Sequence, residues 1–242
     1  MTSFEYMYRA VLPFEHPLYQ RVNRLLRKLA GPLGSEARIL DVGGRRSNYT
    51  VGIPGRVWVS DVPRATDLQV RLDLGATDGI VETVRGRRSN IERYLIDDMT
   101  RSVLQDDSFD LVVAIEVLEH VQEDRLFVEN VRRVLRPGGW FVMTTPNGDD
   151  TPLPYPDHKR HYRKHDLREL LAGSLSDVHV RYCVRDDGLF RTGARKWSVR
   201  RPLRTLTSMA AFFAAYRLEQ IKSVEDRPVV TLHLMASARK QA

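Results

Sequence analysis

The sequence predicts an α/β domain in which a mostly parallel sheet is covered by helices on both faces. Short apolar segments alternate along the chain with segments whose apolar residues recur at helical spacing. One of the apolar segments, Phe109–Ile115 (FDLVVAI), is apolar almost throughout, as expected of a strand buried on both faces of a parallel sheet. Such alternation is typical of sheets with helices on both sides, and 242 residues suffice for one domain with a sizeable core.

Strands and helices can be placed in order from these patterns. A first helix is expected over Leu18–Leu29, whose apolar residues share one face. Two more helices are expected over Asp124–Leu135 and His165–Leu175, and the glycines of Arg136-Pro137-Gly138-Gly139 should end the first of these. The expected strands are 38–42, 56–60, 94–96, 109–115, 140–144, 178–184 and 229–236.

The composition favours no single class of partner. Lys and Arg outnumber Asp and Glu by 38 to 31, and the net charge of +7 favours anionic partners in general, but the basic residues are spread over the whole length. The single cysteine, Cys183, allows neither an internal disulfide nor a cysteine-based metal site. The first residues lack the pattern of a secretory signal, and no apolar run long enough to span a membrane is present. A reducing cytoplasm is therefore the expected compartment.

A glycine loop after the first strand is the leading site candidate, because ligands of open α/β sheets bind at the carboxyl ends of the strands. Gly43-Gly44 follows this strand, but Arg45 and Asn48 break the dinucleotide-binding pattern, and no phosphate loop is present. The carboxylate of Asp41 would also repel a pyrophosphate. Asp61 ends the next strand, at the separation from which a carboxylate can accept hydrogen bonds from ribose hydroxyls. A nucleoside with a cationic centre, such as S-adenosylmethionine, suits both acids.

The segment 97–147 (DDMTRSVLQDDSFDLVVAIEVLEHVQEDRLFVENVRRVLRPGGWFVMTTPN) resembles the class I S-adenosylmethionine-dependent methyltransferases. It holds an aspartate, an S-F-D-L-V strand, E-V-L-E-H, R-V-L-x-P-G-G and a strand ending in T-x-P-N, in the family's order. The resemblance covers residues 36–182 and the last strand. It implies a Rossmann-like, doubly wound sheet of seven strands with an antiparallel last strand in a methyltransferase domain at 35–242. The amphipathic stretch Leu18–Leu29 separately predicts that residues 1–34 form cap helices packed on this domain.

The resemblance also implies which residues contact the cofactor. Asp41, Gly43 and Gly44 are expected on the methionine side, Asp61 at the ribose, Asp98 at the adenine amino group, Met99 against the adenine ring, and Glu116 beneath the cofactor. The family pattern has glycines at positions 45 and 47, where this chain has Arg45 and Ser47. Arg45 and Arg46 are expected either to point to solvent or to meet an anionic group of the acceptor. Each acid could instead cap a turn at the end of its strand.

Two histidines are the candidate bases for the acceptor. His158 and His161 lie before the helix at 165–175, in a stretch similar to the acceptor side of relatives that act on small molecules and sugars. Either could instead have a structural role. His120 occurs in relatives with unlike substrates, which favours a scaffold or cofactor-loop role. The three histidines His158, His161 and His165 lie close together in the chain. They form no recognisable ligand spacing with an acid, so no metal is expected.

These features predict methyl transfer from S-adenosylmethionine to an O or N atom of a small molecule, a sugar or another secondary metabolite, with S-adenosylhomocysteine as the product. The transfer is an in-line displacement. The alternatives are methylation of RNA or another polyanion, against which the lack of a basic arm argues, and a non-catalytic cofactor-binding partner subunit. The segment 191–227 interrupts the alternation and is expected to be a lid or a contact between copies of a homo-oligomer; a membrane-surface helix is the third alternative.

Overall fold

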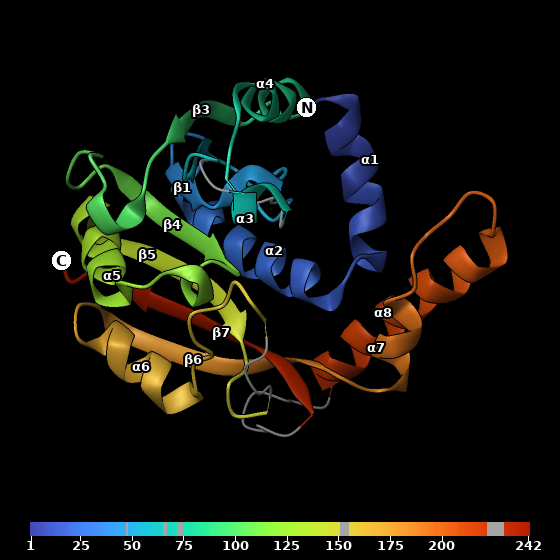
Figure 1. The fold of residues 1–242 in the computed structure, drawn as a ribbon. Coiled ribbons are helices and arrows are strands. Elements are labelled where there is room, and N and C mark those ends of the chain that lie inside the picture. Colours follow the sequence, from blue (N-terminus) through green and yellow to red (C-terminus); the bar gives the residue numbers. More distant parts are fainter. Residues whose placement is uncertain (47, 65–66, 72–74, 151–154, 222–229) are drawn as a thin grey trace.

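The computed structural model describes residues 1–242 apart from 47, 65–66, 72–74, 151–154 and 222–229. Its centre is a seven-stranded sheet in the order β3-β2-β1-β4-β5-β7-β6 (Figure 1). The strands are β1 (Arg38–Val42), β2 (Arg56–Asp61), β3 (Ile91–Ile96), β4 (Phe109–Ile115), β5 (Leu135–Pro146), β6 (Ser176–Arg185) and β7 (Thr231–Arg239). β7 pairs antiparallel with β5 and β6, whereas the other strand pairs described are parallel. The predicted fold class is confirmed.

Helices pack on both faces of this sheet (Figure 1). The described α-helices are α1 (Ser3–Val11), α2 (Pro17–Ala30), α3 (Asp67–Arg71), α4 (Asp78–Arg87), α5 (Asp124–Val134), α6 (Lys164–Ala172), α7 (Gly188–Gly193) and α8 (Pro202–Ile221). The sequence patterns predict α2, α5 and α6 to within three residues at each end. They give no bounds for α1, α3, α4 or α7, which are all ten residues or shorter, although α1 lies in the region 1–34 where cap helices are expected.

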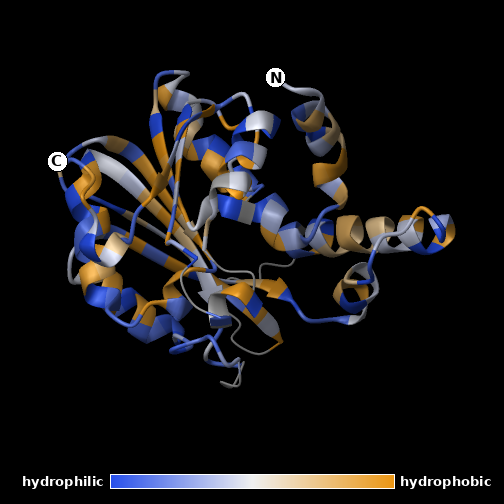
Figure 2. Ribbon diagram, turned by 45° about the horizontal axis from the view of Figure 1, so that its top comes forward, coloured by the Kyte–Doolittle hydropathy of each residue, from blue (hydrophilic) through white to orange (hydrophobic). Residues whose placement is uncertain are grey.

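The central strand β4 contributes to two separate cores. Leu111 and Val113 join the core under α2, whereas Val112 and Ala114 join the core under α5 and α6. Successive side chains of a strand point to opposite faces, so a strand covered on both faces is apolar throughout. Figure 2 shows that the central strands are largely hydrophobic and that the helices around them are of mixed hydropathy. This burial fixes the position of the loops at the carboxyl ends of the strands.

Helix α5 ends differently from the sequence prediction. It stops at Val134, and Leu135 has extended backbone angles (φ −68°, ψ 139°) that begin β5 directly. Gly138 does have a left-handed φ of +77°, but it lies within β5, where its N–H donates to the carbonyl of Lys240 (3.0 Å). Pro137 still prevents the helix from continuing. The glycine therefore serves a bend in the strand and does not cap the helix.

Helices α7 and α8 extend away from the sheet and meet the N-terminal helices (Figure 1). α8 packs on α2 and on the 3₁₀ turn Leu12–Phe14. Its Glu219 accepts from Arg21 of α2 (2.7 Å), and both side chains are less than 10% exposed. The described part of segment 191–227 is thus joined to the N-terminal cap by a buried ion pair. In the described residues, no helix combines the length and the apolar character needed to cross a membrane.

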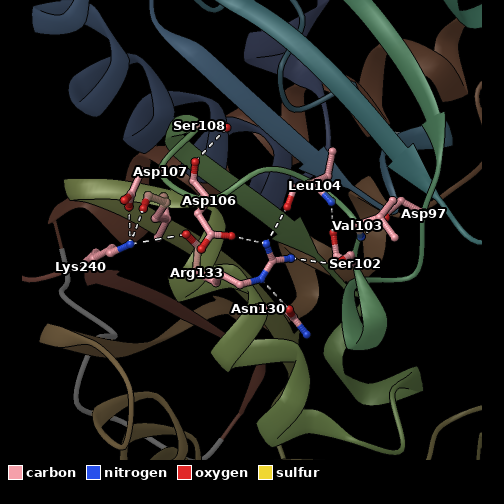
Figure 3. Close-up of polar contacts among 11 residues, drawn as sticks. Asp97, Ser102, Val103, Leu104, Asp106, Asp107, Ser108, Asn130, Arg133 and Lys240 are labelled. Atoms are coloured by element: carbon pink, nitrogen blue, oxygen red, sulfur yellow. Dashed lines mark hydrogen bonds and ion pairs between the residues drawn. The ribbon is translucent and has the colours of Figure 1, made fainter.

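The loop between β3 and β4 is held by α5. Arg133 donates to the carbonyl oxygens of Ser102 (2.8 Å) and Leu104 (2.6 Å), and the backbone N–H of Val103 donates to Asp97 Oδ1 (3.2 Å; Figure 3). A guanidinium that binds two carbonyls at once leaves the loop little freedom. The loop that leaves the carboxyl end of β3 is thereby tied to α5.

Candidate cofactor site

A cleft of about 590 Å³ opens at the carboxyl ends of β1, β2, β3 and β4. Among the residues that line it are Gly43, Asp61, Asp98, Glu116, Val117 and His120. The strand order reverses between β1 and β4, and open α/β sheets bind their ligands at such a reversal. Three carboxylates from three successive strand ends share this one cleft.

The glycines after β1 let two loops approach each other closely. Gly43 has a φ of +68°, and a Cβ on it would lie 2.7 Å from Cγ2 of Val117, in the loop after β4. A Cβ on Gly44 would lie 2.7 Å from Cγ of Asp41. Side chains at these positions would therefore need the neighbours to move, and Gly43 exposes its backbone to the cleft.

Asp41 lies beneath the glycine loop and is not among the described residues that line the cleft. It is 1% exposed and accepts a hydrogen bond from the hydroxyl of Thr50 (2.6 Å). The buried Arg88 donates to the same hydroxyl (2.6 Å). This network supports the loop from below. A direct contact of Asp41 with a cofactor stays a prediction.

Arg45 faces Asp61 and does not point to solvent. Arg45 Nε lies 3.7 Å from Asp61 Oδ2, and their side chains are 8% and 10% exposed. Asp61 also accepts from the backbone N–H of Val62 (2.9 Å). Burial raises the pKa of Asp61 to about 6, and the Arg45 guanidinium opposes this rise only in part. The arginine that replaces a family glycine thus pairs with the carboxylate predicted to hold the ribose; the side chain of Arg46 lies outside the described residues.

Asp98 and Met99 occupy different surroundings. Asp98 lines the cleft and caps the short turn that follows it, accepting from the backbone N–H (3.0 Å) and the hydroxyl (2.8 Å) of Thr100. Both of these bonds end on Oδ1, while Oδ2 lies 3.3 Å from Arg101 Nε. Met99 is 2% exposed and belongs to the core under α5, so it is not among the described residues that line the cleft. The cap and the ligand role of Asp98 are compatible, because a carboxylate can accept several hydrogen bonds.

Glu116 is held at the end of β4 in a left-handed backbone conformation (φ +54°). Its carboxylate accepts from the Thr144 hydroxyl (2.7 Å) and lies 3.1 Å from Nδ1 of His233. Burial by itself would raise the pKa of Glu116, but His233 and the hydroxyl together bring this pKa below its usual value. A negative charge is therefore kept at the floor of the cleft. A non-glycine residue at positive φ is strained, and such strain is common at functional sites.

The predicted bases form a pair beside the cleft. His158 Nδ1 lies 2.7 Å from His161 Nε2, and the ring of His158 stands edge-on to that of His120 with centroids 4.8 Å apart. Burial and the neighbouring His120 lower the pKa of His158. His120, Asp157 and Lys159 line the cleft, so the loop that carries His158 forms one of its walls.

Several residues of this site have no role in the sequence prediction. His233 comes from β7, and Glu119 is buried behind the cleft, where the Thr145 hydroxyl donates to its Oε2 (3.2 Å). Burial and the charge of Glu116 raise the pKa of Glu119 well above its usual value. Glu119 is part of the E-V-L-E-H motif, so the motif could have predicted that it lies at the site. No motif includes His233, because its neighbours in the site come from distant parts of the chain.

Comparison with known proteins agrees with this geometry. A family model described as a methyltransferase domain matches residues 72–143. A probable S-adenosylmethionine-dependent methyltransferase of Mycolicibacterium smegmatis is 46% identical over 131 residues, which are 51% of this chain and 48% of that protein. Residues 72–143 therefore belong to a methyltransferase domain. The chain spans about half the length of this relative, so the activity of the whole protein is a proposal.

Solved structures with the class I methyltransferase fold resemble the whole chain at low sequence identity. Haemonchus contortus phosphoethanolamine N-methyltransferase 2, in complex with S-adenosyl-L-methionine, has a TM-score of 0.56 at 14% identity and covers 91% of this chain and 52% of its own. The [4+2]-cyclase SpnF has a TM-score of 0.55 at 17% identity, over 92% of this chain and 81% of its own. These likenesses show the fold. Chemistry must be argued from the site.

The cofactor of class I methyltransferases is S-adenosylmethionine, and the cleft suits it. The exposed Gly43 backbone gives room for the close approach of a ligand. Asp61, Asp98 and Glu116 offer acceptors for hydroxyl and amino groups and favour a cationic sulfonium. The cleft is also lined by two apolar side chains, those of Val117 and Phe127. The residues present therefore fit an adenosyl group with a positively charged tail.

Proposed function

We propose that the protein transfers a methyl group from S-adenosylmethionine to an O or N atom of a small molecule, a sugar or another secondary metabolite, and releases S-adenosylhomocysteine. The observation that carries this proposal is the gathering of Asp61, Asp98 and Glu116 from three strand ends in one cleft. S-adenosylmethionine, when bound, supplies a methyl group that is electrophilic because it is attached to a sulfonium. The residues of the chain must bind and orient both reactants and handle the proton of the acceptor.

In this proposal, Asp61 accepts hydrogen bonds from the ribose hydroxyls. Its carboxylate is nearly buried at the end of β2, and Arg45 must share it with the ribose or move aside. Asp98 lies one strand further out. Its Oδ2 can accept a hydrogen bond from the adenine amino group if the side chain of Arg101 moves away, and Arg101 has room to move because it is 83% exposed. Gly43 and Asp41 support the methionine end, the first by its exposed backbone and the second from beneath.

His158 is the proposed base for the acceptor. Its lowered pKa favours the neutral ring, which is the form that can take a proton. The contact of its Nδ1 with His161 Nε2 at 2.7 Å lets the second histidine orient the ring and share the charge after proton transfer. For an amine acceptor, the same pair would take the proton of an ammonium group before transfer.

Segment 191–227 is proposed to act as a lid over the acceptor, held against the N-terminal cap. The ring of His16 lies edge-on to His233, with centroids 6.0 Å apart, and to Phe190 of α7 at 5.1 Å. His233 in turn contacts Glu116 at the floor of the cleft. A continuous path of side chains therefore joins the cleft to α7, which supports a lid role for segment 191–227. Phe212 of α8 is 6% exposed and packs against Gly193, so it is part of the core of that lid.

The test is transfer of labelled methyl from S-adenosylmethionine into a fractionated small-molecule extract, with total RNA as a parallel acceptor. Label in the small-molecule fraction is expected, and Asp61→Asn should lower both this transfer and the calorimetric affinity for S-adenosylhomocysteine. Asp186→Asn removes a partly exposed acid that pairs with Arg191; it is the control and should change neither. Label in RNA alone would favour the polyanion alternative. Failure to bind either form of the cofactor would overturn the proposal.

A further inference from the structure

A cluster of metal-ligating side chains lies at the wall of the cleft. Glu119, His120 and His158 each place one ligand atom within 4.8 Å of the other two. Glu119 and His120 belong to the 3₁₀ turn Leu118–His120 after β4, whereas His158 comes from the loop before α6. The fold therefore brings the imidazole of His158 next to the carboxylate of Glu119 and the imidazole of His120, which are nearly forty positions earlier in the chain.

The turn and the loop are joined by contacts that fix this arrangement. The backbone N–H of Lys159 donates to the carbonyl of Glu119 (2.6 Å), next to His158. The Thr145 hydroxyl donates to Oε2 of Glu119 (3.2 Å), which orients the carboxylate. Glu119 is 1% exposed. An ionised carboxylate buried this deeply needs a cation beside it, so a metal ion that takes the place of the proton would stabilise its charged form.

Both imidazoles are oriented through Nδ1. His120 Nδ1 lies 3.3 Å from the carbonyl oxygen of Asp157 and 3.3 Å from its carboxylate. His158 Nδ1 lies 2.7 Å from His161 Nε2. The Nε2 atom of each ring is then the nitrogen left for a ligand. Histidines that bind metals in proteins are held in this way, with the second ring nitrogen bonded to a carboxylate, a carbonyl or another polar group.

We propose that Glu119, His120 and His158 bind a divalent first-row transition metal through one carboxylate oxygen and two Nε2 atoms. Two imidazoles and one carboxylate with further positions open are a ligand set of catalytic zinc sites, and the mixed N/O donors also suit manganese, iron and cobalt. Of the three ligands, His120 lines the cofactor cleft, so the metal would lie beside it. A metal-bound His158 has no free nitrogen to act as the base; in that state the metal would lower the pKa of an acceptor hydroxyl in its place. This acceptor role rests on the proposed methyl transfer, whereas metal binding itself does not.

A second cluster gives a matched control. His165, Asp166 and Glu169 on α6 also hold ligand atoms within 4.8 Å of one another. Their side chains are 76%, 61% and 70% exposed, on the surface of one helix. Exposed side chains must lose conformational freedom before they can bind an ion, so this cluster should bind weakly. Replacing His165 tests whether metal binding depends on the proposed ligands or whether another histidine close to them in the chain is enough.

The experiment is a titration of the chelator-treated full chain with Co²⁺, followed by its visible d–d absorption and by competition with Zn²⁺. One equivalent of Co²⁺ should give the bands, and Zn²⁺ should remove them. Glu119→Gln and His158→Asn should each weaken binding by about tenfold or more, and His165→Asn should leave it unchanged. Circular dichroism of each variant shows whether it is folded, and His158, on a loop, keeps the test valid if Glu119→Gln unfolds.

Three results would overturn the proposal. They are the absence of d–d bands, bands that persist unchanged in folded His158→Asn, and loss of the bands in His165→Asn. The titration uses no S-adenosylmethionine. Failure of methyl transfer with intact Co²⁺ bands would therefore count against the proposed function alone.

Discussion

Replacement of Asp61 by asparagine should stabilise the folded protein at neutral pH even though it weakens cofactor binding. The Asp61 side chain is 10% exposed, and burial raises its pKa from an ordinary 3.8 to about 6. The folded state therefore binds this proton more tightly than the unfolded chain, and stability falls as the pH rises from 3.8 through 6. One pKa unit corresponds to about 1.4 kcal/mol, so full ionisation of Asp61 costs about 3 kcal/mol.

Urea unfolding of wild type and Asp61→Asn between about pH 4 and pH 7.5 measures this cost. Asparagine has the shape of the protonated acid, and all other groups titrate alike in the two proteins, so their difference isolates Asp61. The free energy of unfolding of the variant relative to wild type should rise by up to about 3 kcal/mol over this range. Asp186→Asn should show a small trend of opposite sign, because Arg191 lowers the pKa of Asp186. A difference for Asp61→Asn that is independent of pH would refute the reasoning.

Three further outcomes are expected. Gly43→Ala should lower calorimetric affinity for S-adenosylhomocysteine by about tenfold, or about 1.4 kcal/mol, because the added Cβ meets the loop after β4. Gly34 also has a positive φ but has open space around it, so Gly34→Ala should lower the stability of the protein and leave this affinity unchanged. Glu219→Gln should cost about 3–5 kcal/mol in urea unfolding, since it leaves Arg21 buried beside a neutral partner; a cost below about 1 kcal/mol would show that the pair is solvated. Cys183 is fully buried and burial raises the pKa of its thiol, so thiol reagents should modify it only after denaturation.

The elements that the sequence predicts well are those whose burial leaves a regular pattern. β1 and β4 have the predicted bounds, because most of their residues are apolar and pack on one of two covered faces. The end of α5 was predicted for the wrong reason: Gly138 serves a bend in β5, three residues beyond the start of that strand. The sequence alone does not distinguish a glycine that caps a helix from one that bends a strand, because both roles use the same positive φ.

The site could be predicted only in part. Asp61, Asp98 and Glu116 were found because each follows a recognisable strand, and parallel strands end at one edge of the sheet. The pairing of Arg45 with Asp61 was not foreseen, since it depends on how the loop after β1 folds against the end of β2. The expectation that no metal binds near His158 considered only acids close by in the chain, whereas Glu119 arrives from another loop.

By itself the sequence determined the succession of the strands and of the helices α2, α5 and α6, the covered faces of the sheet and the edge at which a ligand would bind. All three follow from the spacing of apolar residues and from the strand ends, which are local properties of the chain. Only the tertiary structure decided that Asp41 supports the loop from beneath, that His233 contacts Glu116, and that Glu119 meets His158. These contacts join residues on different loops, and their distances depend on how the sheet twists and how the loops pack, which no local pattern records.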